Sequence, residues 1–330
     1  MSAGRSPKLS ETEAARLLQG LGVNAPITAL SGCEDWNGVA TCVTVANDTR
    51  FRLFHFPDNG GRAAKEASLL HRIGTEGEVP VPPVVGVDPQ GKLAPEPTLV
   101  VRDGSGLPVF DIAGLSPSNQ TALFRAYGET LAALHQIRYD AVGPIAADGT
   151  VREGTPNRWG QWMETRIGEL VAKVSLDGCD LNKQTLKEAI EAESAGLPTA
   201  VDPVLVKGFY GFEGLLVDPD ADPLVCAVRG FDRAIAAPAA YGYTVAHWSI
   251  CGRNFRSSTF SEAFETGYRS RQTAETDLSN ERCHTLYRFE RILNEMAGIE
   301  QAKKTGIIDE MEATRQRDRL LYHLERQLGE

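Results

Sequence analysis

Apolar residues follow two different spacings along this chain. Short apolar runs of strand length predict strands at 39–46, 50–56 and 98–102. Apolar positions that recur every three or four residues predict helices at 10–22 and 62–73, and Ser10 and Glu13 form a capping box that begins the first helix. The first third of the chain is therefore expected to be rich in β-structure, with helices beside the strands.

Beyond residue 103 the composition changes from β-rich to helix-rich. Amphipathic patterns predict helices at 117–137, 158–174, 181–194, 241–250, 259–269, 283–296 and 308–328. His135 lies near the end of the first of these helices, where we expect a structural role beside the last carbonyl groups. The sequence thus predicts an N-terminal β-rich lobe of residues 1–102 and a C-terminal helical lobe of residues 103–330.

The stretch 203–234 interrupts the helical pattern with β-structure. Its apolar runs 204–206, 215–217 and 224–228 are separated by a loop with three glycines and by an Asp- and Pro-rich turn at 218–223. Glycine and proline in these places are typical of tight connections. We expect a β-hairpin with a glycine-rich loop at its mouth.

Charge and cysteine content restrict the class of protein. A formal net charge of −10 makes nucleic acid an improbable partner, because phosphate binding needs a basic surface. No apolar run reaches the ~18 residues of a membrane-spanning helix, and the N-terminus lacks the apolar core of a secretory signal. The six cysteines contain no C-x-x-C pair, so we expect reduced thiols in a cytoplasmic protein.

The order of these elements resembles that of the aminoglycoside phosphotransferase/choline-kinase-like family over about residues 25–270. The resemblance is carried by segments 62–70 (RAAKEASLL), 79–82 (VPVP), 127–135 (YGETLAALH), 207–209 (KGF), 215–218 (LLVD) and 230–234 (GFDRA). It implies a two-lobed protein-kinase-like α+β fold. A small N-terminal antiparallel sheet with one helix would precede a larger, mainly helical lobe that carries the catalytic-loop hairpin.

The resemblance also shows which catalytic groups are replaced. Family members use H-G-D-x-x-x-x-N, in which Asp is the base and Asn holds magnesium, and a second magnesium-binding Asp in I-D-[FW]-[DE]. Here the first motif reads Lys207-Gly208-Phe209, and Gly214 stands at the Asn position. Gly230 stands at the position of the second Asp.

The phosphate-binding strand differs from the family pattern as well. Phe54 falls where the family has a Lys that reaches the phosphates. Glu66 matches the helical glutamate that pairs with this Lys, so it should lack its ion pair unless Arg52 or His55 partly substitutes. A general base contributes about 10²–10⁴ in rate, and hard cations need oxygen ligands. We therefore expect no ATP-dependent kinase activity, no metal site and no cofactor.

Aromatic side chains stand where the family has charged ones. They predict an interlobe cleft that binds an apolar or aromatic small molecule, because such ligands suit apolar pockets with few polar groups. The ligand-binding candidates are Phe54, Glu66, Phe209, Phe212, Arg229, Phe231 and His247. The structural alternative is a collapsed cleft in which the aromatic residues form core.

Three functions remain open at this point. A repurposed biosynthetic enzyme, such as a cyclase, isomerase or dehydratase, would work by acid–base catalysis with Asp232, Lys207, Tyr210 and Glu213 as candidates. A non-catalytic, pseudokinase-like protein would bind a small molecule or a protein partner. An active small-molecule phosphotransferase with an unorthodox site is the third alternative.

Overall fold

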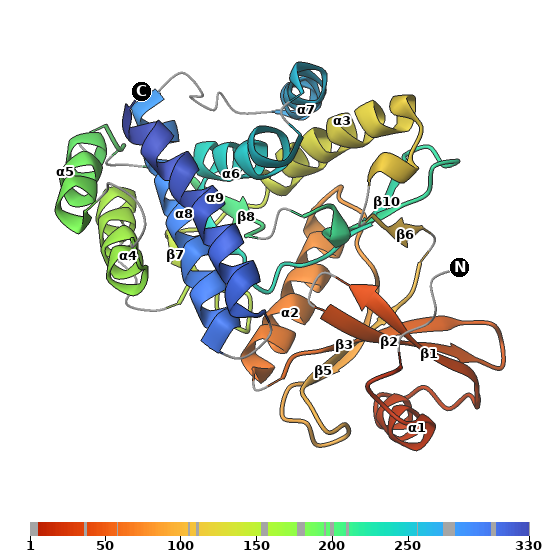
Figure 1. Ribbon diagram of the computed structural model, residues 1–330. Helices are drawn as coiled ribbons and strands as arrows, with labels where there is room; N and C mark the ends of the chain where they lie inside the picture. The colour runs from red at the N-terminus through yellow and green to blue at the C-terminus, as the bar shows by residue number, and fades with distance from the viewer. Residues whose placement is uncertain are drawn as a thin grey trace.

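The computed structural model shows a β-rich region followed by a mainly helical one (Figure 1). It describes residues 6–35, 38–57, 59–104, 106–109, 112–152, 158–176, 182–194, 196–198, 201–208, 211–255, 257–272, 281–304 and 308–329. Phe209 and Tyr210 therefore lie outside the described residues, and the side chain of Glu213 is not described either.

A five-stranded antiparallel sheet forms the β-rich region, in the order β1-β2-β3-β5-β4. Its strands are β1 (Ile27–Asp35), β2 (Gly38–Val45), β3 (Arg50–His55), β4 (Val84–Asp88) and β5 (Thr98–Arg102). Helix α1 (Glu11–Gly20) starts with the predicted capping box and packs on one face of the sheet. Helix α2 (Gly60–Glu76) packs against the other face, where Phe54 is buried.

Strand β1 was not predicted from the sequence. Its central Ser31 and Gly32 interrupt the apolar pattern, yet the backbone pairs with β2 along nearly its whole length. The pairing brings Cys33 and Cys42 together as a disulfide whose Cα atoms lie 6.4 Å apart. The expectation that all cysteines are reduced is wrong for this pair, because residues nine positions apart in sequence become cross-strand neighbours.

Two small sheets lie in the second region. One has the order β10-β9-β6 and the other β7-β11-β8. Their strands are β6 (Leu107–Pro108), β7 (Gly143–Pro144), β8 (Pro203–Val206), β9 (Leu215–Val217), β10 (Val225–Val228) and β11 (Ile235–Pro238). The predicted hairpin holds for β9 and β10, but β8 pairs with β11 instead. Strand β11 has the sequence Ile-Ala-Ala-Pro. It has only four residues, and the two alanines have small side chains, so it gave no recognisable strand pattern.

Helices make up most of the second region. They are α3 (Pro117–Leu134), α4 (Trp159–Lys173), α5 (Lys183–Ser194), α6 (Ala239–His247), α7 (Ser258–Arg271), α8 (Glu281–Lys304) and α9 (Glu310–Gly329). A π-helical segment, Trp248–Phe255, continues α6. In Figure 1 the long helices α8 and α9 lie side by side, with α4 and α5 next to α8. Among the described residues, no helix is long and apolar enough to cross a membrane.

One apolar core connects the two regions. It extends from the inner face of the sheet through α2 and α3 to α8 and α9. Within it lie several fully buried or nearly buried polar side chains, among them Glu66, Lys207, Arg229 and Asp232. Since buried charges need partners, the contacts of these residues locate the candidate site. The lobe boundary at residue 103 stays a prediction, although β5 ends at Arg102 and β6 already belongs to the second region.

Candidate functional site

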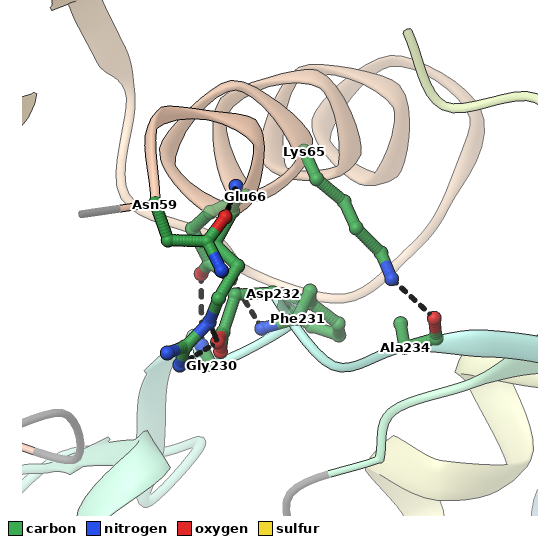
Figure 2. A network of polar contacts seen from close by, with 8 residues as sticks. Asn59, Lys65, Glu66, Gly230, Phe231, Asp232 and Ala234 are labelled. Atoms are coloured by element: carbon green, nitrogen blue, oxygen red, sulfur yellow. Dashed lines mark hydrogen bonds and ion pairs between the residues drawn. The ribbon is translucent and has the colours of Figure 1, made fainter. Parts of the chain in front are cut away.

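Helix α2 presents three polar side chains to the segment 230–234. Asn59 caps the helix by accepting a hydrogen bond from the backbone N–H of Arg62 at 3.2 Å. Arg62 and Glu66 are four residues apart and therefore lie on the same side of the helix, with Lys65 beside them. Figure 2 shows Glu66 and Lys65 reaching from α2 toward this segment.

The carboxylate of Glu66 is bonded to backbone rather than to a lysine. One oxygen accepts from the N–H of Gly230 at 2.8 Å, and the other accepts from the N–H of Phe231 (Figure 2). Full burial and the charge of Asp232 raise the pKa of Glu66, while the two N–H groups and Lys207 oppose that rise. Because two successive N–H groups point at one anion, this backbone forms a small anion-binding nest that Glu66 fills.

Gly230 makes this nest sterically feasible. Its φ of +86° lies in the left-handed region, which side-chain-bearing residues rarely adopt. The predicted replacement of a magnesium-binding Asp by Gly230 thus has a structural counterpart. Gly230, which the family resemblance assigns to a metal-ligand position, has a backbone N–H that holds Glu66.

Asp232 is held by Arg62. The Nε of Arg62 donates to Oδ2 of Asp232 at 2.7 Å, and a second guanidinium nitrogen bonds the same oxygen. The Asp232 side chain is almost fully buried, whereas Arg62 keeps 34% of its side chain exposed. One carboxylate of the segment is therefore already neutralised by a cation from α2.

Lys65 makes the third contact between α2 and this segment. Its Nζ donates to the carbonyl oxygen of Ala234 at 2.6 Å (Figure 2). Burial lowers the pKa of Lys65 to about 8; the charges of Arg152 and Arg62 act in the same direction, and those of Asp232 and Glu66 oppose them. A substantial fraction of Lys65 is therefore neutral a little above pH 8.

The predicted aromatic cleft residues that the structure describes are packed in the core. Phe54 and Phe231 are fully buried, and Phe212 packs edge-on against Phe124 with ring centroids 5.1 Å apart. Arg229 lies over the Phe54 ring at 5.4 Å, and the Nζ of Lys207 lies 5.8 Å from the centre of the Phe231 ring. These cation–aromatic contacts occupy the region that the sequence assigned to a ligand.

Three other predicted residues lie elsewhere in the structure. Arg52 pairs with Asp103 at 3.1 Å, and the His55 ring lies between the hydroxyls of Thr41 and Thr98. Neither supplies the predicted substitute ion pair, because the carboxylate of Glu66 is bonded to Gly230 and Phe231. His247 bonds Ser261 at 2.6 Å, and burial lowers its pKa.

An open pocket lies beside this network, against the helical region. We call it the helical-lobe pocket; its volume is about 660 Å³. It is lined by Lys65, Pro144, Arg152, Trp162, Thr165, Arg166, Glu169, Gly208, Arg233, Ile235, Tyr241, Val245, Glu290, Arg291 and Asn294. Two of the four predicted catalytic residues, Lys207 and Asp232, precede a lining residue in the sequence but do not themselves line the pocket. The pocket is strongly charged and so differs from the predicted apolar cleft.

Sequence reasoning missed the residues of this pocket. Lys65 and Arg233 both occur in the segments that carried the family resemblance, but neither was proposed as a site residue. Most of the remaining lining comes from α4, α6 and α8, and the rest from Pro144, Arg152, Gly208 and Ile235; no local pattern shows how these parts of the chain are placed relative to one another. Among the described residues, no three His, Cys, Asp or Glu side chains are grouped as a metal site would need.

Comparisons with known proteins agree with this architecture. Residues 42–277 match a family model described as "Phosphotransferase enzyme family". A comparison with curated protein sequences finds no significant match.

Solved structures with the same fold have low sequence identity. A protein from Ralstonia eutropha JMP134, assigned to the aminoglycoside phosphotransferases, superposes with a TM-score of 0.71 at 16% identity, over 97% of this chain and 96% of that one. A thermostable mutant of the aminoglycoside phosphotransferase APH(4)-Ia, in a ternary complex with ADP and hygromycin B, gives 0.65 at 15% identity, over 95% and 98%. The macrolide 2'-phosphotransferase MphH from Brachybacterium faecium gives 0.62 at 17% identity, over 93% and 97%. The expected two-lobed kinase-like fold is thereby confirmed.

Proposed function

The chain belongs to the phosphotransferase enzyme family, and within it we propose a member that binds a small molecule without transferring phosphate from Mg-ATP. The observation that carries this proposal is the bonding of Glu66 to the backbone of Gly230 and Phe231. Phosphoryl transfer relies on charges that position the phosphates and on carboxylates that hold magnesium. Here the helical glutamate is engaged by backbone, and the magnesium position has no side chain.

The surroundings of Glu66 support the same conclusion. Phe54 stands in the strand position of the phosphate-binding Lys and is fully buried under Arg229. Asp232, which the family pattern places next to the metal site, is bonded to Arg62. A nucleotide would have to displace buried side chains from both regions, and removing them from their partners costs free energy.

The helical-lobe pocket supports small-molecule binding at a different place. It is open, and Gly208 and Arg233, which lie against each other, belong to its lining. Its volume is within the range of ligand pockets in proteins. The ligand that such a lining favours is polar and charged rather than purely apolar.

Acid–base catalysis in this pocket is the less favoured function. Lys207 is fully buried against Phe231, and Asp232 is bonded to Arg62, so neither presents a proton-transfer group to the pocket. A candidate base must come within hydrogen-bond reach of the proton it takes. The catalytic assignments of Asp232, Lys207, Tyr210 and Glu213 therefore stay predictions.

Thermal unfolding with nucleotide tests the loss of kinase chemistry. We expect the melting temperature to be the same with ATP plus MgCl₂ as with ATP plus EDTA, because Gly230 has no carboxylate to bind magnesium and Asp232 is bonded to Arg62. A ligand at a hundred times its Kd would add about 2.7 kcal/mol of stability, which is a rise of about 5 °C or more for a domain of this size. Differential scanning fluorimetry measures this directly.

The phosphotransferase that was crystallised with ADP and hygromycin B is a suitable positive control for the same assay. A magnesium-dependent rise in the melting temperature of this chain would contradict the proposal. It would favour instead an active small-molecule phosphotransferase with an unorthodox site, the function that family membership alone suggests.

A further inference from the structure

The lining of the helical-lobe pocket has an excess of positive charge. Its five cationic side chains are Lys65, Arg152, Arg166, Arg233 and Arg291, against the two carboxylates of Glu169 and Glu290. The whole chain has a formal charge of −10, so this excess does not follow from composition. A positively charged pocket in a negatively charged protein attracts anionic ligand groups.

The carboxylates of the lining are already engaged by other groups. Glu290 accepts from Arg166 at 3.2 Å and from the hydroxyl of Tyr241 at 2.7 Å. Glu169 lies 4.0 Å from Lys173 at the surface, and Arg291 pairs with Glu295 at 3.0 Å. Of the lining cations, Arg166 and Arg291 thus have carboxylate partners.

Arg233 is the cation of the lining without such a partner. Among the residues that the structure describes, none forms an ion pair or a side-chain hydrogen bond with its guanidinium. The charge of Asp232 opposes the lowering of the pKa of Arg233, and Oδ2 of Asp232 accepts two hydrogen bonds from Arg62. A guanidinium offers five donors in a planar fork, which suits a carboxylate or a phosphate.

The cations of the pocket also repel one another. Burial and the charges of Arg62 and Arg291 lower the pKa of Arg233, against the attraction of Asp232. The charge of Arg152 likewise lowers the pKa of Lys65. The ammonium of Lys65 also donates to the carbonyl oxygen of Ala234. Repulsion between these like charges is reduced when an anion enters the pocket.

We propose that the helical-lobe pocket binds the anionic group, a carboxylate or a phosphate, of a small molecule, with Arg233 as its principal ligand and Arg152 and Lys65 contributing charge. The proposal rests on the proposed function, since it names the ligand class for that pocket. The rings of Trp162 and Tyr241 also line the pocket and offer apolar surface to the carbon part of the ligand.

Titration calorimetry with ligands that share one ring tests this inference. The probes are benzoate, phenyl phosphate and benzyl alcohol, which carry a carboxylate, a phosphate and a neutral hydroxyl. We expect at least one anion to bind more tightly than benzyl alcohol. The tighter of the two anions then identifies the source of the charge as a carboxylate or a phosphate.

Substitution of Arg233 assigns the binding to this pocket. The variant Arg233→Gln should weaken anion binding about tenfold, which is the usual effect of losing a hydrogen bond to a charged group. The control is Arg125→Gln on α3, since Arg125 is exposed and pairs with Glu129 within its own helix. Equal affinities of wild type and Arg233→Gln for the anion would overturn the inference.

The pH dependence gives a second readout. Lys65 is protonated below its pKa of about 8, so the affinity for benzoate should fall between pH 7 and pH 9 as this positive charge is lost. The groups that act on Lys65 are Glu66 and Arg62 from its own helix, Asp232 from the facing segment, and Arg152. Benzoate stays ionised across this range, and the variant Lys65→Met should show a flat profile. A fall of the same size in Lys65→Met would contradict the role of Lys65.

The outcomes separate this inference from the proposed function. Binding of benzyl alcohol as tight as that of both anions would overturn the inference and leave small-molecule binding in place. A magnesium-dependent stabilisation by ATP would overturn the proposed function whatever the anions do. Absence of anion binding at millimolar concentration to a folded wild-type protein would also overturn the inference.

Discussion

Replacing Glu66 by alanine is expected to lower the free energy of unfolding by about 3–5 kcal/mol. The substitution leaves the N–H groups of Gly230 and Phe231 without their acceptor in a buried place. Each unsatisfied donor costs about 1–3 kcal/mol.

Urea unfolding followed by circular dichroism measures this effect. The matched control is Glu76→Ala on the same helix, because Glu76 is half-exposed and pairs only with Arg72 one turn before it. A surface substitution of this kind should change stability by about 0.5 kcal/mol or less. If Glu66→Ala cost no more than the control, the bonds to Gly230 and Phe231 would not hold α2 in place.

Gly128→Ala is expected to destabilise the protein by about 3 kcal/mol, the upper end of what overpacking usually costs. Gly128 lies in α3 where that helix crosses α7. A Cβ atom there would lie 2.1 Å from the carbonyl oxygen of Phe264 and 2.7 Å from the backbone nitrogen of Tyr268. Helix α7 also needs a glycine at this crossing, because a Cβ on Gly267 would lie 2.0 Å from the carbonyl oxygen of Arg125. Backbone atoms cannot rotate away, so the helices would have to separate.

The control for this prediction changes a glycine that has no close neighbour. Gly298 lies inside α8, two turns before its end, and a Cβ there would meet no atom outside the helix's own backbone within 4 Å. Gly298→Ala should therefore stabilise the protein by about 0.5–1 kcal/mol, because alanine loses less backbone entropy in a helix. Thermal or urea unfolding of both variants would show opposite signs, and a stable Gly128→Ala protein would contradict the close helix crossing.

Elements with local signals could be predicted from the sequence. The capping box at Ser10 and the Ser116-Pro117 start of α3 are fixed by hydrogen bonds within a few residues, and both occur in the structure. The predicted strand 98–102 coincides with β5. Its signal is also local, because a proline and a charged residue bound its apolar run. Strands β1 and β11 depend on partners distant in sequence, so their small or polar residues gave no local pattern.

The candidate site could be predicted only in part. The replacement of catalytic groups at Phe209, Gly214 and Gly230 is inferred from side-chain chemistry, which is visible in a sequence, and it stays a prediction. The new partner of Glu66 is a pair of backbone N–H groups, which every residue except proline possesses, so no residue type pointed to it. The charge of the helical-lobe pocket arises from five cationic residues in separate parts of the chain, and only folding brings them together.

The three contacts of α2 with the segment 230–234 have a mechanical consequence. Arg62, Lys65 and Glu66 lie within little more than one turn of α2, and each is bonded to a different point of that segment. A hinge between the β-rich and helical regions would have to break all three contacts before it could open. Ligand entry to the helical-lobe pocket should therefore proceed without domain closure, so its association rate would be governed by diffusion and charge rather than by a slow conformational step.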